Sequence, residues 1–108
     1  MANTFKNAAT GSNTTINTLY TCPGGTNAVV HAMYLSNVDG TNAATINLSI
    51  SGSANFDHRT YILKTVEVPA DSTVIIEKPI NLGPGDKLET QASADGDIEA
   101  FASILEIT

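Results

Sequence analysis

The chain contains few of the residues that usually act in catalysis or crosslink small domains. It contains one cysteine, no tryptophan and two histidines among 108 residues. Because the single Cys22 cannot form an intrachain disulfide, stability must come from packing or from association with other chains. No apolar run approaches the length of a membrane-spanning helix.

Positive charge is scarce as well. Five Lys and Arg stand against eleven Asp and Glu, which gives a formal net charge of −6. Proteins that bind a nucleic-acid backbone or an anionic membrane need the opposite sign, so we expect neither as a partner. The opening residues, Met1 to Lys6, have no apolar core of signal-peptide length, so we expect the chain to be made and folded in a reducing cytoplasm.

The residues that are abundant indicate an ordered β-protein. The composition is 42% hydrophobic and 15% charged, which is typical of one globular domain rather than a disordered chain. Thr, Asn and Ser carry much of the remaining polarity, and they suit exposed strand faces and turns. No segment carries apolar residues at helical spacing for three turns.

The stretch from Val66 to Ala92 shows the pattern most clearly. Short alternating segments are separated by Pro69 with its following residues and by a Gly-Pro-Gly turn at 83–85. This arrangement predicts a meander of three consecutive strands.

Three other segments predict strands with definable faces. Residues 44–51 alternate cleanly, with Ala44, Ile46, Leu48 and Ile50 on the core side. In 28–38 we expect Val30, Ala32 and Tyr34 on one face and Val29, His31, Met33 and Leu35 on the other. In 98–107 we expect Ile98, Ala100, Ala102 and Ile104 on one face and Glu99, Phe101, Ser103, Leu105 and Ile107 on the other. The last two strands are apolar on both sides, which indicates a second cover or another subunit.

The pattern as a whole predicts an all-β fold, a single antiparallel β-sandwich of about eight strands with a jelly-roll-like form. We expect the sandwich to span 14–108 and residues 1–13 to form a flexible N-terminal arm. An alternative for this arm is docking on a neighbouring subunit through Phe5, its only large apolar residue.

No catalytic set can be assembled from the chain, so we expect no enzyme, no cofactor and no metal site. The acidic residues Asp95, Asp97 and Glu99 have a calcium-loop spacing but lack the remaining ligands. The segment Gly52–Arg59 is either a solvated loop or a contact patch. The candidate interface residues are Phe5, Phe56, Asp57, His58, Arg59 and Tyr61.

Five stretches carry a resemblance to a known family: Leu19–Gly24, Leu35–Gly40, Val68–Thr73, Leu82–Leu88 and Phe101–Ile107. Through these stretches, the region from about Leu19 to Thr108 resembles small virion structural proteins of tailed bacteriophages, of the cyanophage and marine phage type. The resemblance implies a β-sandwich part of the virion that is synthesised in the host cytoplasm.

Within the virion, the favoured role is a capsid decoration or cement protein outside the head shell, in contact with the major capsid protein or other virion proteins. The apolar faces favour a homo-oligomer, a trimer or a dimer. One alternative is a tail, collar or neck adaptor or fibre-associated protein. Another is a carbohydrate-binding β-sandwich module, for which Phe56 and Tyr61 would supply the exposed aromatic pair.

Overall fold

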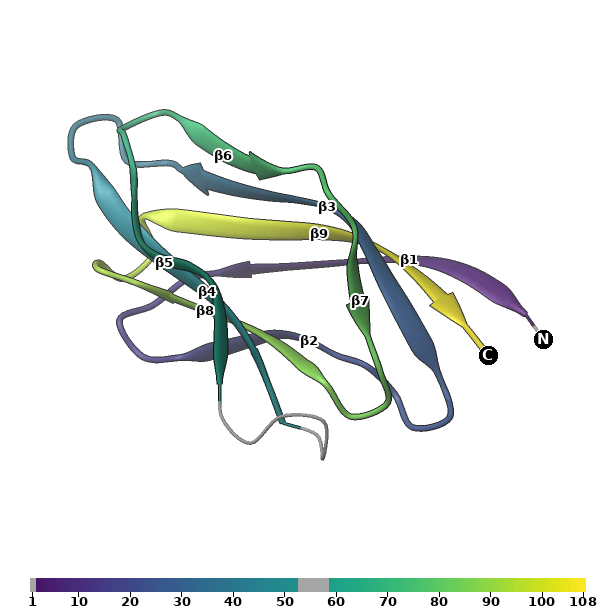
Figure 1. Ribbon diagram of the computed structural model, residues 1–108. Coiled ribbons are helices and arrows are strands. Elements are labelled where there is room, and N and C mark those ends of the chain that lie inside the picture. Colours follow the sequence, from purple (N-terminus) through teal and green to yellow (C-terminus); the bar gives the residue numbers. More distant parts are fainter. Residues whose placement is uncertain (1, 53–58) are drawn as a thin grey trace.

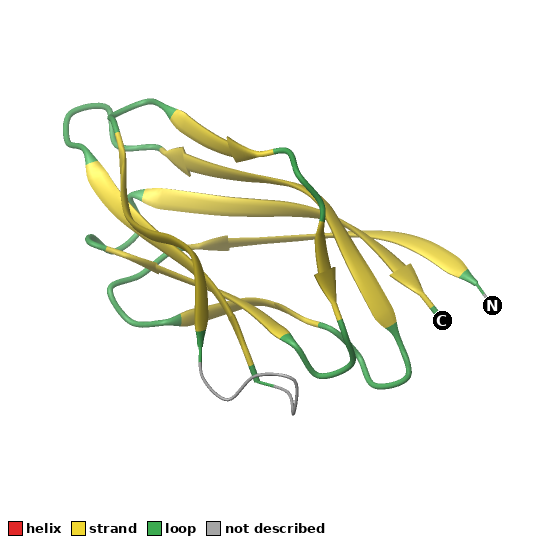
Figure 2. Ribbon diagram, viewed as in Figure 1, coloured by secondary structure: helices red, strands yellow, loops and turns green. Residues whose placement is uncertain are grey.

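The computed structural model describes residues 2–52 and 59–108. All regular structure in this part of the chain is β-strand (Figure 2). The described residues contain no helix long and apolar enough to cross a membrane. The strands are β1 (Asn3–Gly11), β2 (Asn17–Thr21), β3 (Asn27–Asn37), β4 (Ala44–Ser51), β5 (Thr60–Val68), β6 (Thr73–Ile76), β7 (Ile80–Leu82), β8 (Lys87–Ala92) and β9 (Ile98–Ile107).

The strands form two antiparallel sheets that lie one over the other (Figure 1). Sheet A has the order β1-β9-β3-β6, with β7 also paired to β3, and sheet B has the order β2-β8-β4-β5. The pairing is nested, because β4 pairs with β5, β3 with β6 and β7, β2 with β8, and β1 with β9. A chain doubled back on itself and rolled into two layers in this way is a jelly roll. The predicted fold class is therefore confirmed.

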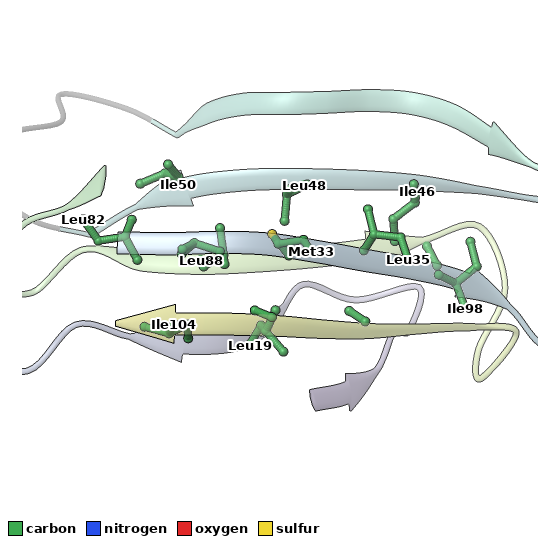
Figure 3. Packing of buried hydrophobic residues seen from close by; sticks show 14 of the residues in the cluster. Leu19, Met33, Leu35, Ile46, Leu48, Ile50, Leu82, Leu88, Ile98 and Ile104 are labelled. Atoms are coloured by element: carbon green, nitrogen blue, oxygen red, sulfur yellow. The ribbon is translucent and has the colours of Figure 1, made fainter. Parts of the chain in front are cut away.

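The core lies between the sheets and is built by alternate residues of each strand (Figure 3). The predicted core side of β4 is buried, from Ala44 through Ile50. The side of β9 that carries Ile98 and Ile104 is buried as well. Both predictions of which side faces the core were correct, because a sheet with one buried face imposes a strict two-residue period.

The side chains of β3 that face the core differ from the prediction because the strand contains a β-bulge at His31. Val30 pairs with Ile104 and Ala32 with Ser103, so one residue of β3 is left over between them. A bulge turns the following side chains to the opposite face. Val30 therefore shares the core with Met33 and Leu35, and the prediction that placed Val30 beside Tyr34 was wrong.

The meander predicted for Val66–Ala92 is also wrong, although its turns are present. The Ser72 N–H donates to the Pro69 carbonyl over 3.1 Å, and Gly85 adopts a φ of 84°. Strands β5 and β8 belong to sheet B, however, while β6 and β7 belong to sheet A. Strand β5 pairs with the preceding strand β4, whereas β6, β7 and β8 pair with strands far away in sequence, which the local pattern does not reveal.

The N-terminal segment differs from the expected flexible arm at 1–13. Asn3 to Gly11 form β1, which pairs with β9 over nine consecutive positions without a break. The sandwich thus begins at Asn3 rather than at 14. The sequence shows no alternation here because β1 is an edge strand, on which only Ala8 and Thr10 are partly buried.

Candidate interaction surfaces

The outer face of sheet A, turned away from sheet B, carries a row of apolar side chains. Cross-strand pairing aligns Ala9 of β1 with Phe101 of β9, Phe101 with Tyr34 of β3, and Tyr34 with Ile75 of β6. The Tyr34 and Phe101 ring centroids lie 6.2 Å apart. Phe101 is 39% exposed and Ile75 50% exposed, so the row is open to solvent.

A second apolar group lies further along the same face. Phe5 pairs with Leu105, and Leu105 pairs with Val29. The Phe5 side chain is 80% exposed, and its ring centroid lies 6.3 Å from that of His31. Most of a large apolar side chain therefore projects from the edge of sheet A into solvent.

A hollow of about 390 Å³ lies on this face beside the apolar row. Its lining comes from β1, β3 and β9 and includes Ala9, Gly11, Tyr34, Glu99 and Phe101. The hollow is therefore bounded on one side by the open edge of sheet A. It can accept an apolar side chain that approaches along that edge.

Over β4 and β8, the outer face of sheet B is polar and internally bonded. The Glu89 carboxylate accepts a hydrogen bond from the Arg59 guanidinium at 2.6 Å and another from the Ser51 hydroxyl. Arg59 also donates to the Ser49 hydroxyl at 3.3 Å. Further along, the side-chain amide oxygen of Asn47 accepts from the Thr65 backbone N–H at 2.6 Å. These side chains satisfy one another and leave little for a partner.

The predicted interface residues do not form one surface. Phe5 lies on β1 at the edge of sheet A, whereas Tyr61 lies on β5 at the edge of sheet B. Tyr61 is 42% exposed, with the Lys64 ammonium 4.6 Å from its ring centroid. Arg59 is committed to its ion pair with Glu89. The remaining candidates, Phe56, Asp57 and His58, lie outside the described residues.

The residues that sequence reasoning missed are Tyr34, Ile75 and Phe101 in the outer row of sheet A. The signal was present, since β3 and β9 were recognised as apolar on both sides. What the sequence did not supply is the register that aligns these side chains across β3, β6 and β9.

A partly buried polar contact links the two sheets. The Tyr20 hydroxyl of β2 donates to the Glu106 carboxylate of β9 at 2.5 Å, and the Lys6 ammonium lies 3.5 Å from the other Glu106 oxygen. Burial is the main cause that raises the pKa of Tyr20, and the Glu106 hydrogen bond and charge raise it further. The contact holds Tyr20 as a neutral donor rather than as a reactive phenolate.

The Cys22 thiol is not suited to act as a nucleophile. Its thiol is buried, with the sulfur 3.2 Å from the Thr26 carbonyl oxygen. Burial, and then the negative charges of Glu106 and Asp86, raise the pKa of the Cys22 thiol. A nucleophilic cysteine needs a lowered pKa and access to substrate, and Cys22 has neither.

The acidic side chains have structural partners of their own. Asp95 accepts from the Thr14 backbone N–H at 2.8 Å, and Asp86 accepts from the Gly83 N–H at 2.8 Å through one oxygen. The other oxygen of Asp86 is buried without a partner among the described residues. Across residues 2–52 and 59–108, no group of three or more His, Cys, Asp or Glu is placed to hold a metal ion.

Comparison with known proteins supports the fold. No protein-family model and no curated protein matches the sequence. Two solved structures match with significant similarity. A chain of the T13 IBDV viral particle aligns with a TM-score of 0.57 and 11% identity over 96% of this chain. A chain from the acidic stable capsid of Helicobacter pylori bacteriophage KHP30 aligns with a TM-score of 0.54 and 13% identity over 100% of this chain.

The two matches differ in how much of the other chain is covered. This chain spans 30% of the length of the IBDV chain but 89% of the length of the KHP30 chain. At such low identity, these likenesses define the fold. The chain thus shares its fold with chains from two viral particles.

Proposed function

We propose that this chain is a non-enzymatic structural protein of a bacteriophage virion, and that it decorates or cements the outside of the head shell. The observation that carries the proposal is the match with the KHP30 capsid chain, which covers all of this chain and 89% of the other. The shared fold accounts for nearly the whole of both. The likeness is therefore between two chains of similar extent, not between this chain and a fragment of a large protein.

The net charge supports a position on the outer side of the shell. The chain carries a formal charge of −6. Packaged nucleic acid presents a dense array of phosphates on the inner side and repels an acidic protein. On the outside, the same charge carries no such penalty.

We assign the contact with the major capsid protein to the outer face of sheet A. Its exposed row of Phe101, Tyr34 and Ile75 is a connected apolar surface rather than scattered single residues. Connected apolar surfaces on small proteins are typical of binding sites. The outer face of sheet B, occupied by its own ion pair and hydrogen bonds, lacks this property.

The test is to add the purified protein, labelled at its C-terminus, to heads that lack it and to image them by electron cryomicroscopy. Added density at a repeating position over the whole head is the expected result. Label confined to the tail, collar or neck would replace the decoration role with that of an adaptor. No label on any particle would overturn the virion assignment.

A carbohydrate-binding module is the second candidate, favoured by one observation. The exposed Tyr34 and Phe101 rings border the hollow on sheet A, and sugar-binding sites use exposed aromatic rings. A glycan array probed with the wild-type protein and with Tyr34→Ala would test it. Binding that disappears in the variant supports this function, and an array without hits removes it.

A further inference from the structure

The edge of sheet A formed by β1 is the most open strand edge of the described chain. On the opposite edge, the short strands β6 and β7 are separated by Glu77, Lys78 and Pro79, residues that discourage further pairing. The edge strands of sheet B, β2 and β5, both contain register shifts. Strand β1 has nine residues, no proline and no bulge.

The hydrogen bonds to β9 fix which backbone groups of β1 point outward. Ala2 and Thr108 exchange two backbone hydrogen bonds, of 3.1 and 2.9 Å, and the Ser12 N–H donates to the Ile98 carbonyl at 2.7 Å. In an antiparallel pair such bonded positions recur at every second residue. The N–H and C=O groups of Asn3, Phe5, Asn7 and Ala9 therefore lie on the open side of β1.

We propose that a second copy of this chain pairs with this edge, β1 against β1 in antiparallel orientation about a two-fold axis at Asn7. The two A sheets then form one continuous sheet. In this register Asn7 lies opposite Asn7 of the second copy, and Phe5 lies opposite Ala9. The dimer is a property of the isolated chain and does not rest on the function proposed above.

The charges on β1 disfavour one of the two adjacent registers. Placing Phe5 opposite Asn7 would set the two Lys6 residues directly opposite each other, and like charges in that position are unfavourable. With Asn7 opposite Asn7, each Lys6 faces Ala8. Lys6 also keeps its contact with Glu106 of its own chain, 3.5 Å away.

The hollow and the projecting ring supply the shape complementarity. Directly opposed residues of an antiparallel pair lie on the same side of the sheet. Phe5 and Ala9 both lie on the outer face, paired with Leu105 and Phe101 respectively. The Phe5 ring of one copy therefore reaches Ala9 and Phe101 of the other, at the border of the 390 Å³ hollow.

The symmetry makes this contact occur twice, once for each Phe5. An interface that joins a patch to an identical patch is the usual form of a two-fold dimer. It would remove from water the most exposed large apolar side chain among the described residues, at 80% exposure.

The first test is the mass of the purified protein by light scattering after size exclusion, at about 100 μM. We expect twice the chain mass of 11.3 kDa. Truncating an interface aromatic typically costs about tenfold or more in affinity, so Phe5→Ser should raise the dissociation constant by that factor. Ile75→Ser, on the same face but at β6, should leave the constant unchanged. A monomer, a trimer, or a dimer broken by Ile75→Ser and not by Phe5→Ser would overturn the proposal.

The second test fixes the register by cysteine crosslinking. Residues in a bonded antiparallel pair have Cα atoms about 5.5 Å apart, within disulfide range. Asn7→Cys should therefore give a disulfide-linked dimer on mild oxidation, while the native Cys22 stays buried. Asn3→Cys keeps Phe5 and the hollow but separates the two thiols by roughly 27 Å, so it should not link. Linking through residue 3 and not through residue 7 would overturn the register.

Discussion

The outer faces of the two sheets differ, although they cover the same core. On sheet B, Glu89, Arg59 and Ser51 bond to one another. On sheet A, Phe5, Tyr34, Ile75 and Phe101 are exposed, and each has an apolar cross-strand partner. The jelly roll needs one buried face per sheet, and it leaves the other two faces free to diverge.

This difference predicts that the outer face of sheet B contributes to folding stability and the outer face of sheet A to association. Changes on the outer face of sheet B remove partners of partly buried charges and should lower the free energy of unfolding. Changes on the outer face of sheet A remove exposed apolar area and should alter binding instead. Of the four predictions below, the first and the last test this division, and the other two test contacts that join the sheets. They run from the largest expected effect to the smallest.

Glu89→Ala should lower the free energy of unfolding by about 2 kcal/mol, because the partly buried Arg59 loses its charged partner. The matched control, Glu99→Ala on the exposed outer side of β9, should change it by no more than about 0.5 kcal/mol. Denaturant midpoints of the two variants measure the difference. Equal losses would show that the two faces do not differ in this respect.

Tyr20→Phe should change the response to alkaline pH. The unfolded chain loses the phenol proton near its ordinary pKa of about 10, whereas in the folded chain burial and Glu106 raise the pKa of Tyr20. The contribution of Tyr20 to the stability of the wild type should therefore be complete below about pH 10 and decline above it. Melting temperatures against pH should show a shallower decline in Tyr20→Phe, and Tyr34→Phe should retain the wild-type decline. A decline that is unchanged in Tyr20→Phe would contradict the link between the sheets.

Asp39→Ala concerns the connection from β3 of sheet A to β4 of sheet B. One Asp39 carboxylate oxygen accepts from the backbone N–H groups of Thr41 and Asn42, and these hydrogen bonds lower the pKa of Asp39. The stabilisation should be present above the ordinary carboxyl pKa and lost as the pH falls below it. The melting temperature of Asp39→Ala should lie below that of the wild type at neutral pH, with the gap closing in acid. If the difference in melting temperature does not change with pH, the destabilisation has a cause other than the charge of Asp39.

Ile75→Ser should have the smallest effect on folding, about 1 kcal/mol or less, because the side chain is half exposed. Its effect should appear in binding to heads, which we expect to weaken. Tyr61→Ser, at the edge of sheet B, is the matched exposed variant and should bind as the wild type does. If Tyr61→Ser weakens binding and Ile75→Ser does not, the shell contact belongs to sheet B.

The candidate surface was only partly accessible from the sequence. Phe5 could be singled out because it is an isolated large apolar residue in a polar segment. Tyr34 and Phe101 lie 67 positions apart in sequence, and only the β3–β9 register brings their rings together. Arg59 was predicted as a contact residue, but its charge is taken up by Glu89, 30 residues further on.

The sequence by itself determined the all-β class, the turns and the buried sides of β4 and β9. These are local properties, since alternation and turn residues act within a few positions. The tertiary structure decided which strands pair, where β3 bulges at His31, and that Asn3–Gly11 join sheet A. The physical reason is that strand pairing and register depend on hydrogen bonds and packing between residues far apart in the chain.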